Sequence, residues 1–175
     1  MKQQLVLSGL GGQGILFVTR LLAETAIAKG YPVLTSETHG MAQRGGVVIS
    51  HLKVGDFASP LVRPGQADAL LSLKGETLPL HLHFLKDGGF FSTNAKSVPA
   101  VAEGINGVLV DADSLALQLK DPQAVNLIVL GRTVAQPGKL FCTAEDIEDA
   151  LRERMKGKEA ALARALAAFR AGLEA

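Results

Sequence analysis

The chain has 175 residues, which is enough to bury a sizeable core within one domain. Its 18 basic and 17 acidic residues leave a formal net charge of +1 without a basic block, which argues against nucleic acid as a partner. No apolar run approaches the roughly 18 residues of a membrane-spanning helix, and the first residues lack the apolar core of a signal peptide. We therefore expect a cytoplasmic protein without membrane contact.

Short apolar runs alternate with stretches of helical periodicity along the chain. Strands are predicted at residues 3–8, 31–36, 47–54, 67–73, 89–93 and 108–111. Helices are predicted at residues 15–29, 78–85, 114–119, 144–154 and 158–173, with Asp113 as the cap of the third and Thr143 as the cap of the fourth. The apolar run within residues 126–135 fits either a strand or a buried helix.

This alternation predicts an α/β fold with three layers, a mostly parallel, Rossmann-like sheet with helices on both faces. Residues 1–175 are expected to form a single domain that ends in the helix at about 158–173. That helix has one apolar face, which either packs on the sheet or mediates a homodimer.

A glycine-rich turn, Gly9-Leu10-Gly11-Gly12-Gln13-Gly14, joins the first predicted strand to the first predicted helix. It satisfies the G-x-G-x-x-G pattern of dinucleotide-binding folds, in which backbone N–H groups at a helix N-terminus bind phosphate. Such folds also place an acidic residue about 20 positions further on, and Glu37 follows the second predicted strand. Three interpretations stay open: a dinucleotide site, a site for another anion, or a tight turn without a ligand.

A second polar segment, residues 37–46, reads Glu-Thr-His-Gly-Met-Ala-Gln-Arg-Gly-Gly. The carboxyl ends of parallel strands share one edge of a sheet, so this segment is expected beside the glycine-rich turn. His39 has an imidazole that can move a proton, and Arg44 has a guanidinium that can clamp a carboxylate or a phosphate. The alternative is a structured loop that docks on another chain.

The other chemistry-bearing side chains predict neither a metal site nor a catalytic residue. Cys142 is the single cysteine, so the chain cannot form an internal disulfide or ligate an iron–sulfur cluster by itself, and we expect a small buried hydrophobe. His81 and His83 would point to different sides of a helix. His51 lies in a predicted strand and is expected to be structural or interfacial.

The glycine-rich turn with Ile15, read together with residues 36–46, resembles the gamma subunit, or gamma domain, of 2-oxoacid:ferredoxin oxidoreductases. The version with His39, Met-Ala-Gln and Arg-Gly-Gly is most similar to the small subunit of indolepyruvate-type enzymes. The similarity extends over most of the chain, including the ending Phe-Arg-Ala-Gly at residues 169–172.

This resemblance implies a non-autonomous subunit of an enzyme that oxidatively decarboxylates a 2-oxoacid, such as pyruvate or indolepyruvate, to an acyl-CoA. Thiamine diphosphate and iron–sulfur clusters would reside in larger partner subunits, ferredoxin would receive electrons from the complex, and the isolated chain would be inactive. The residues that would face the cleft and contact coenzyme A or the 2-oxoacid are Gly9, Gly11, Gly12, Gln13, Gly14, Glu37, His39 and Arg44.

Two further functions stay open. An autonomous protein could bind NAD or FAD through the glycine-rich turn and Glu37. A dimeric scaffold could assemble through the apolar face of residues 158–173.

Overall fold

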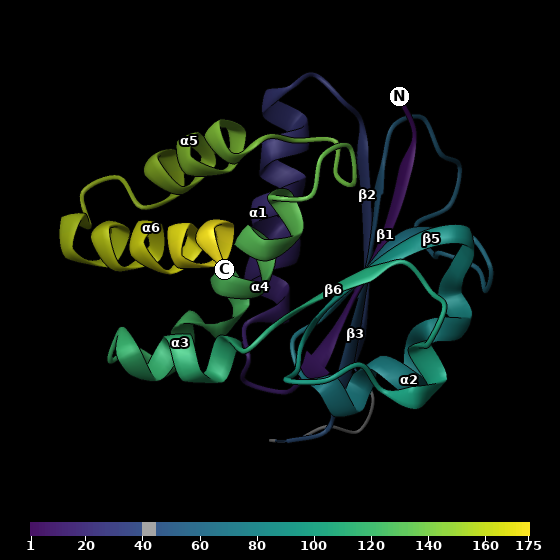
Figure 1. The fold of residues 1–175 in the computed structure, drawn as a ribbon. Coiled ribbons are helices and arrows are strands. Elements are labelled where there is room, and N and C mark those ends of the chain that lie inside the picture. The colour runs from purple at the N-terminus through teal and green to yellow at the C-terminus, as the bar shows by residue number, and fades with distance from the viewer. Residues whose placement is uncertain (40–44) are drawn as a thin grey trace.

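The computed structural model describes residues 1–39 and 45–175, with the backbone alone at residues 38, 39 and 101. Within these residues the chain forms a six-stranded sheet in the order β2-β3-β1-β4-β5-β6 (Figure 1). The strands are β1 (Gln3–Leu10), β2 (Val33–His39), β3 (Val47–Val54), β4 (Ala67–Ser72), β5 (Leu85–Asn94) and β6 (Gly107–Val110).

The sheet is mixed, and β3 accounts for its antiparallel pairs. β3 pairs antiparallel with β1 on one side and with β2 on the other, whereas β1, β4, β5 and β6 pair in parallel. Five of the six strands therefore run in one direction, which confirms the predicted mostly parallel α/β sheet.

The longer helices lie on one face of the sheet, which we call the helical face (Figure 1). These helices are α1 (Ile15–Ala28), α3 (Ala112–Gln118), α4 (Val125–Val134), α5 (Ala144–Arg154) and α6 (Glu159–Glu174). α1 and α4 pack directly on the strands, and α5 and α6 cover them as an outer layer. The core of this face is mostly aliphatic, and its fully buried members include Leu5, Leu7, Val18, Leu22, Leu52, Leu71, Ile128 and Phe169.

Glycines bring α4 and α6 into backbone contact. A Cβ on Gly172 would lie 2.0 Å from the carbonyl oxygen of Ile128, and a Cβ on Gly131 would lie 2.1 Å from that of Phe169. The apolar face of the last helix is thus used within the chain, against α4, with Ala165, Ala168 and Phe169 buried.

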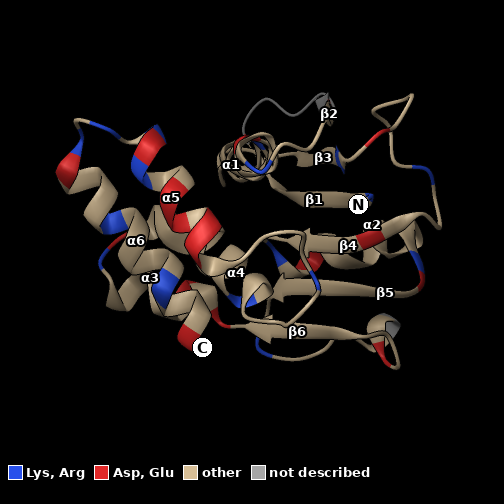
Figure 2. Ribbon diagram, turned by 90° about the horizontal axis from the view of Figure 1, so that it is seen from above, with Lys and Arg blue, Asp and Glu red and all other residues tan. Residues whose placement is uncertain are grey.

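The opposite face has a thinner cover, made by α2 (Leu78–His81), three single 3₁₀ turns at Gly75–Thr77, Leu82–Phe84 and Ala100–Ala102, and the loop 55–66. Its smaller apolar core contains Val6, Val62, Leu70, Leu78 and Phe91. Helices therefore cover both faces as predicted, but very unequally. Most Lys, Arg, Asp and Glu lie in loops and on outer helices such as α5 (Figure 2), and no described helix is long and apolar enough to cross a membrane.

Several predicted strand boundaries were wrong, because pairing with neighbouring strands extends beyond the predicted ends. The second strand continues to His39, because β2 pairs with β3 along its length up to His39↔Val48, so residues 37–39 are strand and not loop. The fifth strand begins at Leu85, since Ala67 pairs with Leu85 before an irregularity in the register. Residues 86–88, which precede the predicted strand at 89–93, are therefore part of β5.

One open helix assignment is settled and one predicted cap is corrected. Residues 126–134 fall within α4, so the buried-helix alternative holds; α4 is apolar on nearly all sides because it lies between the sheet and α6. The cap of α3 is Asp111 and not Asp113, because the Asp111 carboxylate accepts from both the N–H and the hydroxyl of Ser114. The cap at Thr143, with Asp146 closing a capping box, is confirmed.

Candidate functional site

The connections after β1 and β4 leave the sheet toward different faces. β1 leads into α1 on the helical face, whereas β4 leads into the 3₁₀ turn and α2 on the opposite face. Ligands in open α/β sheets bind at such a reversal, beyond the carboxyl ends of the strands. We call this place between the ends of β1 and β4 the crevice.

The glycine-rich turn borders the crevice in a conformation that requires glycine. Gly12 and Gly14 have φ angles of 92° and 78°, in the left-handed region that side chains disfavour. Gly14 is the N-cap of α1, and no side chain caps this helix. The first N–H groups of α1 are therefore left without an intrahelical or capping partner.

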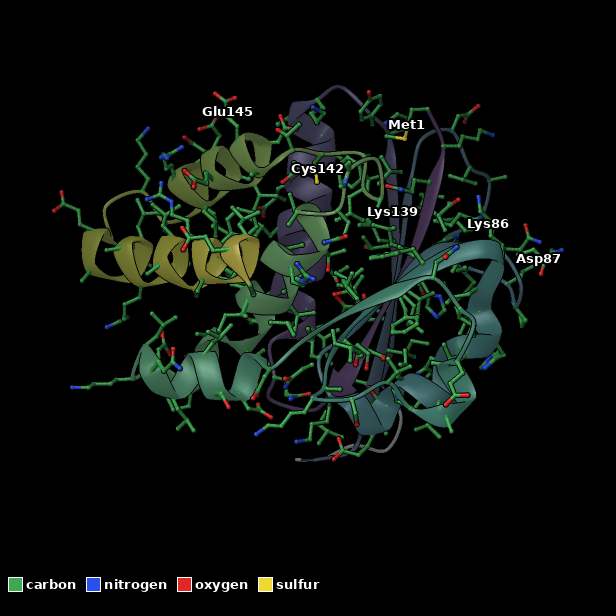
Figure 3. The ribbon with its side chains drawn as sticks, in the orientation of Figure 1. Met1, Lys86, Asp87, Lys139, Cys142 and Glu145 are labelled. Carbon is green, nitrogen blue, oxygen red and sulfur yellow. The ribbon has the colours of Figure 1, made fainter. Side chains whose placement is uncertain are left out.

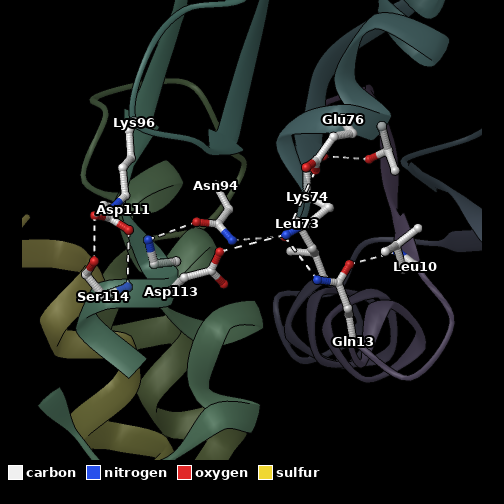
Figure 4. Close-up of polar contacts among 12 residues, drawn as sticks. Leu10, Gln13, Leu73, Lys74, Glu76, Asn94, Lys96, Asp111, Asp113 and Ser114 are labelled. Atoms are coloured by element: carbon white, nitrogen blue, oxygen red, sulfur yellow. Dashed lines mark hydrogen bonds and ion pairs between the residues drawn. The ribbon is translucent and has the colours of Figure 1, made fainter. Parts of the chain in front are cut away.

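Gln13 ties the turn to the neighbouring strand and is not a free ligand-binding group. Its Oε1 accepts from the Leu10 N–H at 2.7 Å, and its Nε2 donates to the Leu73 carbonyl at 3.3 Å (Figure 4). Asn94 donates to the same carbonyl at 3.4 Å, and its Oδ1 accepts from Ala112 N–H at 3.0 Å. Together the two amides join the ends of β1, β4 and β5 to the start of α3.

Buried hydroxyls support the crevice from the opposite face. Thr77 Oγ1 lies 3.2 Å from Ser8 Oγ and 3.0 Å from Ser72 Oγ, and both Ser72 and Thr77 donate to the Lys74 carbonyl. This holds the backbone of Lys74 at the end of β4. Its ammonium lies 4.0 Å from carboxylates of both Glu76 and Asp113 (Figure 4).

The two predicted loops meet at one point. The Gly11 N–H donates to the Gly46 carbonyl at 2.9 Å, and Leu10 pairs with Val47. The glycine-rich turn and the last residues of the 37–46 segment are thus neighbours, as expected. Arg44 and the side chain of His39 lie outside the described residues, so their predicted roles stay predictions.

Glu37 is separated from the glycine-rich turn by a strand. It lies in β2, opposite Ser50, and β3 runs between β2 and β1. Two strand spacings, about 10 Å, therefore separate it from the β1 backbone, whereas the acidic residue of a dinucleotide fold stands on the adjacent strand. This order disfavours the dinucleotide interpretation.

A cavity of about 530 Å³ opens beside the glycine-rich turn. Gly12, Gln13 and Gly14 form one wall, the start of α4 with Asn126 forms a second, and α6 with Arg164 forms a third. Neither Asn126 nor Arg164 was predicted as a site residue. One feature of the sequence could have drawn attention to Asn126: it is an isolated polar residue before the apolar run Leu127–Leu130, and it follows Pro122 closely.

Asn126 presents an uncommitted donor at this cavity. It is only 9% exposed, and its Oδ1 accepts from the Leu127 N–H at 2.6 Å. Its Nδ2 makes no hydrogen bond with a described residue, and it lies 2.3 Å from where a Cβ on Gly14 would stand. Because Asn126 lines the cavity and its Nδ2 is not fully buried, this group can donate to a ligand that accepts a hydrogen bond.

The charged side chains in the cavity lining are one guanidinium and two carboxylates. Arg164 forms no ion pair with a described residue, whereas the two acidic residues in the lining are engaged. Asp121 accepts from the Gln123 N–H at 3.1 Å, and Asp113 lies near Lys74. The free groups that remain are donors: the first N–H groups of α1, the Asn126 amide and the Arg164 guanidinium.

Other polar groups near the crevice are structural. Hydrogen bonds from Ser114 hold the pKa of Asp111 below its usual value, and Lys96 adds an ion pair at 3.4 Å (Figure 4). Among the described residues, no group of three His, Cys, Asp or Glu side chains could hold a metal ion.

Cys142 is buried between α1 and the start of α5 (Figure 3), and burial raises the pKa of its thiol to about 12. It is therefore a packed, unreactive hydrophobe, as predicted.

His81 and His83 also lack a metal-ligand set among the residues that the structure describes. His81 is buried with Nδ1 3.0 Å from the Thr77 carbonyl, whereas His83 is exposed and lies against Phe84.

Comparison with known proteins gives one consistent family. The family described as pyruvate ferredoxin/flavodoxin oxidoreductase matches residues 4–175. Indolepyruvate oxidoreductase subunit IorB of Archaeoglobus fulgidus is 33% identical over 90% of this chain and 88% of its own length. The corresponding subunit of Pyrococcus horikoshii is 32% identical over 85% of this chain and 84% of its own length.

Solved structures agree with the sequence relatives. A keto/oxoacid ferredoxin oxidoreductase gamma subunit from Geobacter sulfurreducens superposes with a TM-score of 0.78 at 26% identity, over 98% of this chain and 96% of that one. A 2-oxoglutarate:ferredoxin oxidoreductase from Magnetococcus marinus, solved with 2-oxoglutarate, coenzyme A and succinyl-CoA bound, contains the same fold in 30% of its chain, with a TM-score of 0.80 at 20% identity.

The resemblance inferred from the two motifs is confirmed, since the relatives of matching length are small or gamma subunits of 2-oxoacid oxidoreductases. With a match that runs from residue 4 to residue 175, the chain belongs to the pyruvate ferredoxin/flavodoxin oxidoreductase family.

Proposed function

We propose that this chain is the gamma-type subunit of a cytoplasmic 2-oxoacid:ferredoxin oxidoreductase. It assists the CoA-dependent oxidative decarboxylation of a 2-oxoacid, with indolepyruvate and pyruvate as the first substrates to test. A larger partner subunit carries thiamine diphosphate and the iron–sulfur clusters and passes electrons to ferredoxin. The isolated chain is inactive.

The residues of this chain do not fit an iron–sulfur cluster. Clusters need several thiolate ligands, whereas Cys142 is the single cysteine and its thiol is buried and protonated. The redox groups of the proposed reaction therefore belong to the partner, and this chain contributes binding and positioning.

The cavity beside Gly12–Gly14 carries the proposal for the site. Its free donors suit a phosphate or another anionic group of coenzyme A, which the chain would hold at the N-terminus of α1 with the Asn126 amide. Gly9 and Gln13 keep the turn in shape, because a Cβ on Gly9 would lie 2.7 Å from Gln13 Oε1. Gly11, Glu37, His39 and Arg44 would face the partner or the 2-oxoacid at the same edge.

Co-expression with the large subunit, followed by an assay of acyl-CoA formation, tests this function. Pyruvate, 2-oxoglutarate, 2-oxoisovalerate and indolepyruvate are supplied in turn. We expect turnover of at least one of them by the complex and none by the isolated chain. A complex that forms and turns over none of the four would contradict the proposal.

Asn126→Asp in the assembled enzyme tests the cavity. It keeps the side-chain shape and the oxygen that accepts from Leu127, but it replaces the free donor with a negative charge. We expect the KM for CoA to rise about tenfold or more with a smaller change in kcat. Asn106→Asp, at an exposed position outside the cavity, is the matched control. Equal effects of both variants would remove Asn126 from the site.

Arg44→Ala distinguishes anion binding from docking. If Arg44 holds an anion, this variant raises the KM for CoA or the 2-oxoacid while the complex stays intact. Loss of assembly with unchanged KM in the remaining complex would assign Arg44 to the interface.

Calorimetric titration of the isolated chain with NAD and FAD tests the competing function. Saturable binding at micromolar concentration would favour an autonomous nucleotide-binding protein and count heavily against the subunit role. We expect none, because β3 separates Glu37 from the glycine-rich turn.

A further inference from the structure

Three cations gather at the other end of β1, on the opposite face of the sheet. Lys53 lies in β3 opposite Gln4, near the beginning of β1, whereas the crevice lies beyond the end of β1. Lys2 directly precedes β1, and Arg63 lies in the loop 55–66, which projects past the amino end of β1 (Figure 2). We call Lys2, Lys53, Arg63 and Phe57 the basic patch.

Lys53 is buried without a counter-charge. Its side chain is only 7% exposed, and it forms neither a hydrogen bond nor an ion pair with a described residue. Residues 40–44, which the structure does not describe, contain no carboxylate. The ammonium at the end of this covered side chain retains some solvent contact, so it is available to an anionic partner.

The neighbours of Lys53 add positive charge instead of neutralising it. Its Nζ lies 5.1 Å from the centre of the Phe57 ring, and the Nζ of Lys2 lies 5.0 Å from the same centre. The ring attracts both ammonium groups, but each repels the other. Burial lowers the pKa of Lys53, and the charge of Arg63 lowers it further.

Among the described residues, no acidic side chain forms an ion pair with the basic patch. Asp68 is paired with Lys86 and also accepts from the Gln4 N–H. Asp56 is exposed and forms no ion pair with a described residue. The basic patch therefore carries an uncompensated positive charge in the free chain.

We propose that the basic patch is a docking site for a segment of the partner subunit that carries aspartate or glutamate side chains. The proposal rests on the proposed function, since it requires the assembled enzyme. A carboxylate from that segment would pair with the Lys53 ammonium. This ammonium retains some solvent contact, whereas four other unpaired side-chain atoms are fully buried, those of Ser50, His51, Ser92 and Thr93. Lys2 and Arg63 would pair at the rim.

Apolar surface beside these charges favours a protein segment over a free anion. Leu61 is 51% exposed in the same loop as Arg63, and the Phe57 side chain is partly exposed. A docked chain covers such side chains while its carboxylates neutralise the cations, which is the composition of a protein interface. A free phosphate would leave the apolar surface uncovered.

Lys53→Met in the complex is the main test. Methionine keeps most of the volume and removes one of three neighbouring positive charges, so the isolated variant should melt at or above the wild-type temperature. In the complex, it leaves the partner's carboxylate buried and unpaired, and the Kd for the large subunit should rise at least about tenfold. Lys2→Met and Arg63→Met should mainly reduce the salt dependence of association.

Lys139→Met is the matched control. The Lys139 ammonium also lies over a phenylalanine ring, 5.3 Å from the centre of Phe90, but outside the basic patch (Figure 3). This variant should bind the large subunit with the wild-type Kd. An unchanged Kd for Lys53→Met overturns the docking proposal while the proposed function stands, whereas a wild-type chain that forms no complex overturns both.

Reductive methylation of lysine amines, read by mass spectrometry, identifies the occupant. We expect Lys53 to react in the isolated chain and to be protected in the complex. Protection by inorganic phosphate alone, equal to that in the complex, would assign the patch to a free anion and overturn the docking proposal, as would full reactivity of Lys53 in the complex.

Discussion

The helical face and the opposite face of the sheet are covered in different ways. The helical face has two layers of helices over an aliphatic core, with α4 and α6 in backbone contact at Gly131 and Gly172. The opposite face has one short helix and three single turns among the described residues, and it buries histidines, hydroxyls and Lys53. The first arrangement contributes stability by burial of apolar surface, whereas the second encloses polar side chains under a thin cover.

Gly172→Ala should be the most damaging small change on the helical face. The new Cβ would lie 2.0 Å from the backbone oxygen of Ile128, so the two helices must separate. We expect a loss of about 3 kcal/mol in the free energy of unfolding, measured by urea denaturation. Ala167→Leu, which adds more atoms on the exposed side of α6, should stay within about 0.5 kcal/mol of wild type.

Gln13→Met tests the edge where the two faces meet. The variant keeps the side-chain length but leaves the Leu10 N–H unpaired and removes one donor from the Leu73 carbonyl. We expect a loss of about 2 kcal/mol by the same measurement, together with faster hydrogen exchange in the glycine-rich turn. Gln118→Met on exposed α3 is the control, and equal losses in both variants would refute the positioning role of Gln13.

The comparison also separates what could be read from the sequence from what could not. Residues 47–54 and 144–154 were predicted with their observed bounds, because a strand of partly alternating apolar and polar residues and a helix with a capping box are specified by their own residues. The glycine-rich turn and its helix followed from the same local rules.

The order of the strands and the packing of distant helices could not be predicted from the sequence. Nothing within β3 indicates that it inserts between β2 and β1, yet this insertion removes Glu37 from the turn. Likewise, α4 is apolar on nearly all sides because α6 covers it. The spacing of its apolar residues therefore could not distinguish a helix from a strand. Asn126 and Lys53 became conspicuous only through their missing partners, which are a property of the folded chain.

Two threonines on the opposite face distinguish paired from unpaired buried hydroxyls. Thr77 Oγ1 has partners in Ser8, Ser72 and the Lys74 carbonyl, whereas Thr93 Oγ1 is fully buried without one. Thr77→Val should reduce the free energy of unfolding by about 1 kcal/mol, and Thr93→Val should leave it unchanged or raise it slightly. The reverse order would mean that an unseen partner, such as an ordered water, satisfies Thr93.

His51→Leu should have the smallest effect at pH 8 and a visible one in acid. Burial lowers the pKa of His51 below its usual 6.5, and the charges of His81 and Lys53 lower it further. The unfolded chain therefore binds the proton first, so the free energy of unfolding falls as the pH drops below 6.5 and levels off once the folded pKa is passed.

Leucine fills a similar volume and removes the unpaired Nδ1, so stability at pH 8 should stay within about 1 kcal/mol of wild type. Urea titrations are made between pH 5 and pH 8, values that bracket the usual histidine pKa of about 6.5. The free energy of unfolding should depend less steeply on pH in the variant than in the wild type. His81 remains and preserves part of the slope, because burial lowers its pKa as well. An unchanged slope would mean that His51 does not titrate with unfolding and that the opposite face owes its acid sensitivity to other groups.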